Sequence, residues 1–140
     1  MVKIEKLVWG VIGVGDVCEK KSAPALKKVA NSTIKTVMRR NEAKVADYAR
    51  RHEILHYTTD ANSILEDPEI NAVYIATPPS SHADFAIKAA AAGKITYVEK
   101  PMAATYNECL EMVNAFEKAN LPLFIAYYRR ALPNFLKVKD

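Results

Sequence analysis

The chain has 140 residues, half of them hydrophobic, which is enough for one globular domain with its own core and too short for two. Its 20 Lys and Arg exceed its 16 Asp and Glu, for a net charge of +4, but the two signs are intermixed and aromatic residues do not accompany the basic ones. We therefore expect no nucleic-acid partner.

Two further classes are disfavoured by the same inspection. No apolar run reaches the roughly 18 residues that a membrane span needs, so we expect no membrane association. Cys18 and Cys109 are far apart and belong to no disulfide or zinc-ligand pattern, so we expect no metal and a reduced, cytoplasmic protein.

Strand-like and helix-like segments alternate along the chain, which is typical of a parallel sheet built from βαβ units. The strands are predicted at Leu7–Ile12, Thr33–Arg39, Leu55–Tyr57, Ala72–Ala76, Ile95–Glu99 and Leu123–Ala126. Their Val, Ile, Leu and Tyr content suits strands that are covered on both faces. The fold class is therefore α/β, a doubly wound and mainly parallel sheet.

Helices are predicted between these strands from capping and breaking residues. They open at Ser22 with Pro24 in the first turn, run from Asn41 to Arg51, start at Asp60 and stop before Pro68, and run from a Ser80 or Ser81 cap to Ala92 before Gly93. The last one follows a capping box from Thr105 to Glu108, and we expect Cys109, Leu110, Val113 and Phe116 to form its apolar face. We place the domain at residues 1–126 and interpret 127–140 as the start of a connection to a second domain that is absent from this chain.

The apolar run from Leu7 ends in a glycine turn. Gly13 and Gly15 have no Cβ to block a tight turn, so the backbone can present N–H groups to a pyrophosphate where Asp16 and Val17 open the next helix. The match to G-x-G-x-x-G is imperfect, because Cys18 occupies the third glycine position. We predict a dinucleotide-binding turn, with Cys18 as a small apolar contact between helix and strand.

The second strand ends in Arg39 and Arg40, where a NAD-binding domain would carry an acid for the ribose 2′-hydroxyl. Guanidinium groups suit a 2′-phosphate instead. We therefore favour NADP over NAD, which stays possible. The alternative is that both arginines are solvated residues that open a helix.

The loop after the fourth strand carries Thr77, Pro78, Pro79 and, in the first helical turn, His82. In a doubly wound sheet this loop borders the ligand crevice, and capping serines would leave helix N–H groups pointing into it. The alternative is a rigid connection in which His82 touches no ligand, and for His82 alone we favour that alternative.

Glu99 and Lys100 end the fifth strand, where the same crevice continues. A lysine there can hydrogen-bond a substrate oxygen and stabilise negative charge on it, and burial would lower its pKa toward proton transfer. The alternative is a solvated Glu-Lys pair before a proline.

Four segments taken together resemble the amino-terminal half of the glucose-fructose oxidoreductase, inositol dehydrogenase and MocA family. They are Trp9 to Asp16, Ala76 to His82, Ala92 to Pro101 and Tyr127 to Arg130. The resemblance covers essentially the whole chain. It implies an NAD(P)-dependent oxidoreductase acting on sugars, cyclitols or related polyols, with a Rossmann domain followed by an α/β domain built on an open sheet.

The resemblance also implies roles for individual residues. Gly13, Gly15 and Val17 would line the pyrophosphate turn, Arg39 the adenosine ribose, and Thr77, Pro78 and His82 the cofactor. Lys100 would contact nicotinamide ribose and substrate, after a cis peptide bond to Pro101, and Arg129 would reach the substrate. Cys18 departs from the family's small residue, and Pro79 stands where many relatives carry Asn.

The family's catalytic Asp and His belong to the second domain, so none of His52, His56 or His82 takes that role, and Lys100 is the catalytic candidate in this chain. We expect the NADP(H)-binding domain of an oxidoreductase that binds cofactor but turns over poorly alone, with a full-length protein that is homo-oligomeric. The alternatives are a non-catalytic, NADP-sensing regulatory protein and a small domain for an unrelated nucleotide.

Overall fold

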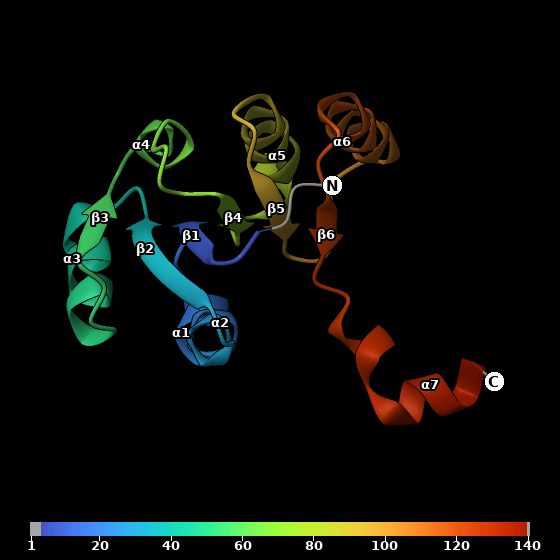
Figure 1. Cartoon of the computed structure of the whole chain (residues 1–140), viewed down its shortest axis with the longest axis horizontal. Helices are drawn as coiled ribbons and strands as arrows, with labels where there is room; N and C mark the ends of the chain where they lie inside the picture. The colour runs from blue at the N-terminus through green and yellow to red at the C-terminus, as the bar shows by residue number, and fades with distance from the viewer. Residues whose placement is uncertain (1–3, 140) are drawn as a thin grey trace.

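The computed structural model describes residues 4–139, which form six strands and the helices between them (Figure 1). The strands are β1 (Leu7–Ile12), β2 (Ser32–Met38), β3 (His56–Thr58), β4 (Ala72–Ile75), β5 (Ile95–Val98) and β6 (Leu123–Ile125). The α-helices are α1 (Asp16–Lys20), α2 (Ser22–Lys28), α3 (Glu42–Arg51), α4 (Asn62–Leu65), α5 (His82–Ala91), α6 (Tyr106–Ala119) and α7 (Pro133–Lys139). Two 3-10 turns, η1 (Pro79–Ser81) and η2 (Tyr128–Ala131), complete the described chain.

All strand pairs are parallel and the strand order is β3-β2-β1-β4-β5-β6. This order is that of a doubly wound dinucleotide-binding sheet, whose winding direction reverses between β1 and β4. The predicted fold class is confirmed. Each predicted strand is present, with ends that differ by at most one residue.

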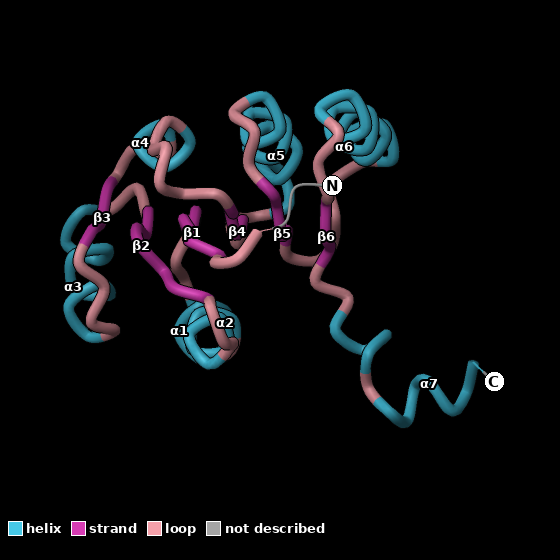
Figure 2. Tube along the Cα trace, in the orientation of Figure 1, coloured by secondary structure: helices cyan, strands magenta, loops and turns pink. Residues whose placement is uncertain are grey.

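Helices cover the two faces of the sheet in separate groups (Figure 2). Helices α4, α5 and α6 lie on one face, where Ile12, Ile75 and Val98 pack against the alanines of α5 and against Phe116 of α6. Helices α1, α2 and α3 lie on the other face, around the second core cluster. All four residues of β4 are buried, because this central strand is covered on both sides.

Local signals account for most helix ends. Asn41 accepts a hydrogen bond from the Lys44 amide, and Thr105 and Glu108 form the predicted capping box. Gly93 ends α5 with a φ of +73°. Ser81 is the N-cap residue of α5, as predicted, but its side chain bonds within the loop and makes no cap hydrogen bond.

The apolar face of α6 was also predicted incorrectly in part. Met112 and Phe116 are buried and Cys109 is half-buried against the same core, but Leu110 and Val113 are 43% and 39% exposed. Residues 109, 112 and 116 follow the three- and four-residue spacing of one helix face, whereas 110 and 113 lie on the neighbouring face. Both cysteines are free.

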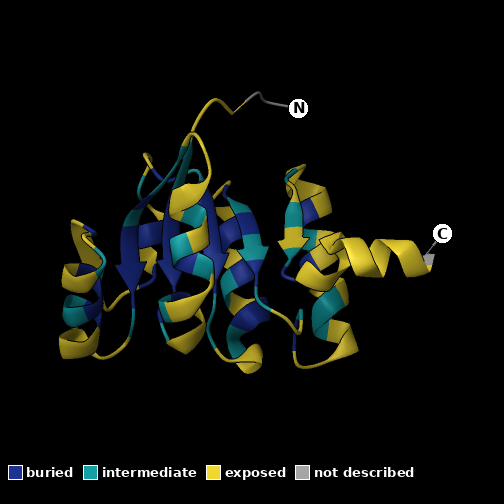
Figure 3. Ribbon diagram, turned by 90° about the horizontal axis from the view of Figure 1, so that it is seen from below, coloured by how far each residue is buried: buried dark blue, intermediate teal, exposed yellow. Residues whose placement is uncertain are grey.

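Two features of the helices were not predicted. The segment after the glycine turn is broken into α1 and α2 at Lys21, which has non-helical dihedral angles of −126° and −67°. Beyond β6 the chain forms α7, which extends away from the sheet with residues 133–138 exposed (Figures 1 and 3). Among the described helices, none has the length and apolar character needed to cross a membrane.

Candidate cofactor-binding crevice

The glycine turn and the loop after β4 meet at the carboxyl edge of the sheet. β1 pairs with β2 on one side and with β4 on the other, so the chain leaves these strands toward opposite faces. Ligands of doubly wound folds bind in the crevice that this divergence opens. The sequence-predicted residues after β1, β2, β4 and β5 all lie at this edge.

Gly13 is required by its close approach to the neighbouring loop. It has a φ of +93°, and a Cβ at this position would lie 2.6 Å from Thr77 Cγ2 and 2.8 Å from the Thr77 amide nitrogen. The amides of Gly13 and Val14 both donate to the Met38 carbonyl oxygen, at 2.9 and 3.1 Å. The turn is thereby fixed between the end of β2 and the loop after β4.

Gly15 differs, because a Cβ there would meet nothing within 4 Å. Its φ of −137° is open to any residue, so no backbone constraint requires glycine. It precedes the first turn of α1, where Asp16 and Val17 are exposed and the helix leaves backbone N–H groups without intrahelical partners. The open space in front of these groups fits an anionic phosphate.

Cys18 packs under this turn as predicted. Its side chain is fully buried, its Sγ lies 3.9 Å from the Gly13 carbonyl oxygen, and its own carbonyl accepts a hydrogen bond from the Tyr48 hydroxyl at 3.2 Å. Burial raises the pKa of the thiol to about 12. Cys18 is therefore a core contact between α1, α3 and the turn.

Arg39 and Arg40 follow β2 beside the glycine turn, since Ile12 and Met38 are partners in the sheet register. Arg39 is half-buried and Arg40 is exposed. Within residues 4–139 neither guanidinium forms a salt bridge, whereas Arg50 and Arg51 in the last turn of α3 are both paired with Asp47. Two cationic groups without a carboxylate partner in the described chain thus border the crevice.

The loop after β4 is held by its own side chains. Ser81 Oγ lies 2.8 Å from Thr77 Oγ1 and 2.9 Å from the Pro78 carbonyl oxygen. Pro78 and Pro79 are exposed at the rim of the crevice, and Thr77 is half-buried next to Gly13.

His82 is fully buried and joins two loops of the crevice. Its Nε2 lies 2.7 Å from the Thr77 carbonyl oxygen and its Nδ1 lies 2.9 Å from the Pro101 carbonyl oxygen. A neutral imidazole donates one of these hydrogen bonds and an imidazolium donates both. The ring connects the loop after β4 to the loop that carries Lys100.

Glu99 and Lys100 differ in exposure. Glu99 is half-buried, and its Oε1 accepts a hydrogen bond of 2.6 Å from the Tyr74 hydroxyl. Lys100 is exposed, so the burial expected for it is not provided by the described residues. The peptide bond between Lys100 and Pro101 is cis, as predicted.

Arg129 lies on η2, beyond β6, where it is exposed and its guanidinium carbon is 5.9 Å from the centroid of the Phe135 ring. The neighbouring Tyr128 has a pKa below its ordinary value, because of a hydrogen bond from Arg129, the charge of Arg129, and the charges of Lys21 and Lys100. Sequence reasoning gave Tyr128 and Lys21 no role, because they lie far apart in the sequence.

The sequence model of one family, described as an oxidoreductase family with an NAD-binding Rossmann fold, matches residues 7–127. The chain belongs to this Gfo/Idh/MocA family. It is an oxidoreductase-family domain that binds a nicotinamide dinucleotide.

Two curated relatives and one solved structure illustrate the match. Oxidoreductase P35 of Formosa agariphila is 48% identical over 135 residues, which are 96% of this chain and 42% of that protein. Inositol 2-dehydrogenase 2 of Saccharopolyspora erythraea is 30% identical over 93% of this chain and 39% of that protein. The chain therefore spans about two fifths of the length of these relatives.

The solved structure is KijD10, a 3-ketoreductase from Actinomadura kijaniata in complex with NADP and TDP-benzene. It superposes with a TM-score of 0.89 at 22% identity, over 96% of this chain and 41% of that chain. At this identity the likeness shows that the two chains share a fold, and nothing further.

Proposed function

We propose that this chain is the NADP(H)-binding domain of an enzyme that transfers hydride between nicotinamide and a sugar, cyclitol or related polyol. The observation that carries the proposal is the open space in front of Gly15, at a helix start and beside two arginines without carboxylate partners. Backbone N–H groups suit the pyrophosphate, and guanidinium groups suit a 2′-phosphate.

The preference for NADP rests on the end of β2. A carboxylate there would accept hydrogen bonds from a free ribose 2′-hydroxyl, but this position holds Arg39 and Arg40. A phosphate adds negative charge and acceptor oxygens that pair with a planar guanidinium. Arg39, the half-buried member, is our primary candidate, with Arg40 in support.

The remaining crevice residues receive roles from their positions. Thr77, Pro78 and Pro79 form the wall that faces the glycine turn, and His82 supports this wall through its two carbonyl contacts. When bound, the cofactor supplies the hydride donor or acceptor. Asp16 and Val17 belong to the turn that would hold its phosphates.

Lys100 is the catalytic candidate. Its exposed ammonium group at the carboxyl end of β5 can donate a hydrogen bond to a substrate hydroxyl or carbonyl oxygen and stabilise negative charge there. Arg129, exposed on η2, is the second candidate for substrate contact. The substrate class follows relatives such as inositol 2-dehydrogenase 2. A second α/β domain after about residue 126, its Asp and His pair, and a homo-oligomeric full-length protein are parts of the same proposal.

Titration of the chain with NADPH and NADH, by fluorescence or calorimetry, tests the cofactor assignment. We expect NADPH to bind more tightly, and Arg39→Asp to remove most of the difference. Lys118→Asp is the matched control, because it makes the same charge change on exposed α6 at the opposite edge of the sheet. Equal binding of the two cofactors, unchanged by Arg39→Asp, would overturn the assignment.

A further inference from the structure

A buried hydroxyl links three elements behind the crevice. Tyr74 is fully buried in β4, and its hydroxyl lies 2.7 Å from Ser22 Oγ and 2.6 Å from Glu99 Oε1. Ser22 Oγ is itself 3.5 Å from the same carboxylate oxygen. The first residue of α2, the middle of the sheet and the end of β5 therefore share one polar contact.

The Tyr74 hydroxyl is a donor in this contact. Burial, together with the hydrogen bond to Glu99, raises the pKa of Tyr74 far above its ordinary value, so the phenol keeps its proton. A hydrogen bond from a neutral donor to an ionised carboxylate is short and strong, in agreement with the 2.6 Å distance. The carboxylate of Glu99 is held from the core side.

The contact continues to the catalytic candidate. Glu99 Oε2, the second oxygen, lies 3.2 Å from the Lys100 amide nitrogen, which donates to it. Both oxygens of Glu99 thus accept hydrogen bonds from the protein, one from the core and one from the backbone that carries Lys100. Through this second hydrogen bond, Glu99 helps to hold the backbone of Lys100 in place.

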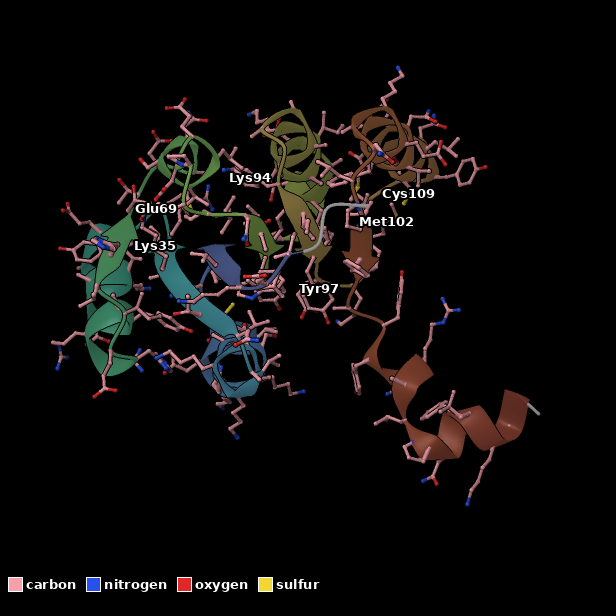
Figure 4. The ribbon with its side chains drawn as sticks, in the orientation of Figure 1. Lys35, Glu69, Lys94, Tyr97, Met102 and Cys109 are labelled. Atoms are coloured by element: carbon pink, nitrogen blue, oxygen red, sulfur yellow. The ribbon has the colours of Figure 1, made fainter. Side chains whose placement is uncertain are left out.

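The hydroxyl is not needed to fill the core. Tyr74 stacks on Tyr97, which is labelled in Figure 4, with ring centroids 5.3 Å apart, on the face of the sheet that α1 and α2 share. A phenylalanine would keep this contact. A buried hydroxyl is costly unless it is hydrogen-bonded. The gain from this one is the position that it imposes on Glu99.

We infer that Tyr74 and Ser22 are positioning residues for Lys100. They hold Glu99, and Glu99 holds the backbone from which Lys100 reaches the nicotinamide end of the crevice. Because Ser22 begins α2, directly after the helix that follows the glycine turn, the same contact couples the phosphate end of the crevice to the lysine end. The inference rests on the proposed binding of NADP(H).

The test compares two ligands on matched variants of the chain. Tyr74→Phe removes the hydroxyl and keeps the ring, and Tyr97→Phe is the control, since no hydrogen bond of the Tyr97 hydroxyl is present among the described residues. The ligands are NADPH and adenosine 2′,5′-bisphosphate, which lacks both the nicotinamide and its ribose. We expect Tyr74→Phe to weaken NADPH about three- to tenfold, as loss of part of a charge-assisted hydrogen bond would.

The ligand without the nicotinamide should bind Tyr74→Phe with the same affinity as it binds the unchanged chain. Tyr97→Phe should bind both ligands with unchanged affinity. An equal loss for both ligands would show a purely structural role and overturn the inference, as would an unchanged NADPH affinity. If the unchanged chain bound neither ligand, the proposed function itself would fail. Ser22→Ala should also weaken NADPH relative to the ligand without the nicotinamide. This variant decides the question if Tyr74→Phe does not fold.

Discussion

The centre of the sheet and its open end at β6 present opposite surfaces. Around β1 and β4 the chain is closely packed, with Val11, Ile12 and Tyr74 fully buried and Gly13 unable to accept even a methyl group. From β6 onward several large apolar side chains are exposed, among them Phe124 at 54% and Phe135 at 49% (Figure 3). This difference in burial occurs within one continuous parallel sheet.

This contrast separates two tasks. The residues proposed to hold the cofactor lie where the described chain supplies their supporting contacts, such as the carbonyl of Met38 for the glycine turn. Arg129, the candidate for substrate, lies where apolar neighbours remain exposed. We therefore expect cofactor binding to be a property of this chain and substrate recognition to depend on surfaces added to its β6 and α7 end.

The largest effect should come from filling the closely packed centre of the sheet. Gly13→Ala places a Cβ against the Thr77 backbone at a φ of +93°, and we expect a loss of about 2–4 kcal/mol in the free energy of unfolding. Urea denaturation measures it. Gly93→Ala is the control, because its φ is also positive, at +73°, but its Cβ would meet nothing within 4 Å. Equal losses would mean that the approach to Thr77 is unimportant.

The next effect should come from Lys94, a buried lysine at the start of β5 (Figure 4). Its Nζ donates to the carbonyl oxygens of Asp67 and Ile70, both at 2.7 Å, and burial lowers its pKa. Lys94→Met leaves two acceptors unpaired, so we expect a loss of about 1–3 kcal/mol in unfolding free energy. The exposed Lys88→Met should change little. If Lys94→Met did not change the unfolding free energy, water would have replaced the ammonium group.

A smaller, pH-dependent effect is expected from Glu19, which connects α1 to α3. Hydrogen bonds from Arg51, and then from His52, lower its pKa to about 2. A lowered folded-state pKa contributes stability above the unfolded value of about 4.3, and this contribution is lost as pH falls toward 2. The pair is partly exposed, so the gain is small.

Unfolding midpoints at pH 5 and at pH 2.5 measure this contribution. Glu19→Gln should lower the midpoint at pH 5 and reduce its fall toward pH 2.5. Glu111→Gln, exposed on α6 without an ion pair in the described chain, should leave the fall unchanged. The same pH dependence in Glu19→Gln and in the unchanged chain would contradict the assignment.

The smallest effect on stability is expected at the open end. Its exposed aromatic side chains should make the chain self-associate, as sedimentation would show. Phe124→Lys with Phe135→Lys should reduce association with almost no change in unfolding free energy. Val29→Lys, 56% exposed after α2, is the control and should leave association as it was. Persistent association of the double variant would place the contact elsewhere.

Much of the fold and part of the crevice could be predicted from local signals. The doubly wound parallel sheet was predicted from the alternation of strands and helices. Gly13, Gly15 and Arg39 were proposed as cofactor contacts because a turn and a strand end mark them in sequence. The contact among Ser22, Tyr74 and Glu99 was not found, since its members are 25 to 77 positions apart and each is ordinary in its own segment.

Two misreadings have the same physical origin. The side chain of Ser81 was assigned to a helix cap, but folding brings it to Thr77 and Pro78 instead. Leu110 and Val113 were placed on the buried face of α6, because an apolar residue alone does not show which neighbouring surface will cover it. Tertiary contacts decide both outcomes.

Gly15→Ala tests the central claim most directly, because the described chain leaves the added methyl group free of contacts. We expect an unfolding free energy within about 0.5 kcal/mol of the unchanged chain. We also expect a clear loss of NADPH affinity, since the methyl group would stand where the pyrophosphate is proposed to lie. Unchanged NADPH affinity in a stably folded Gly15→Ala chain would contradict the claim that this turn holds the cofactor.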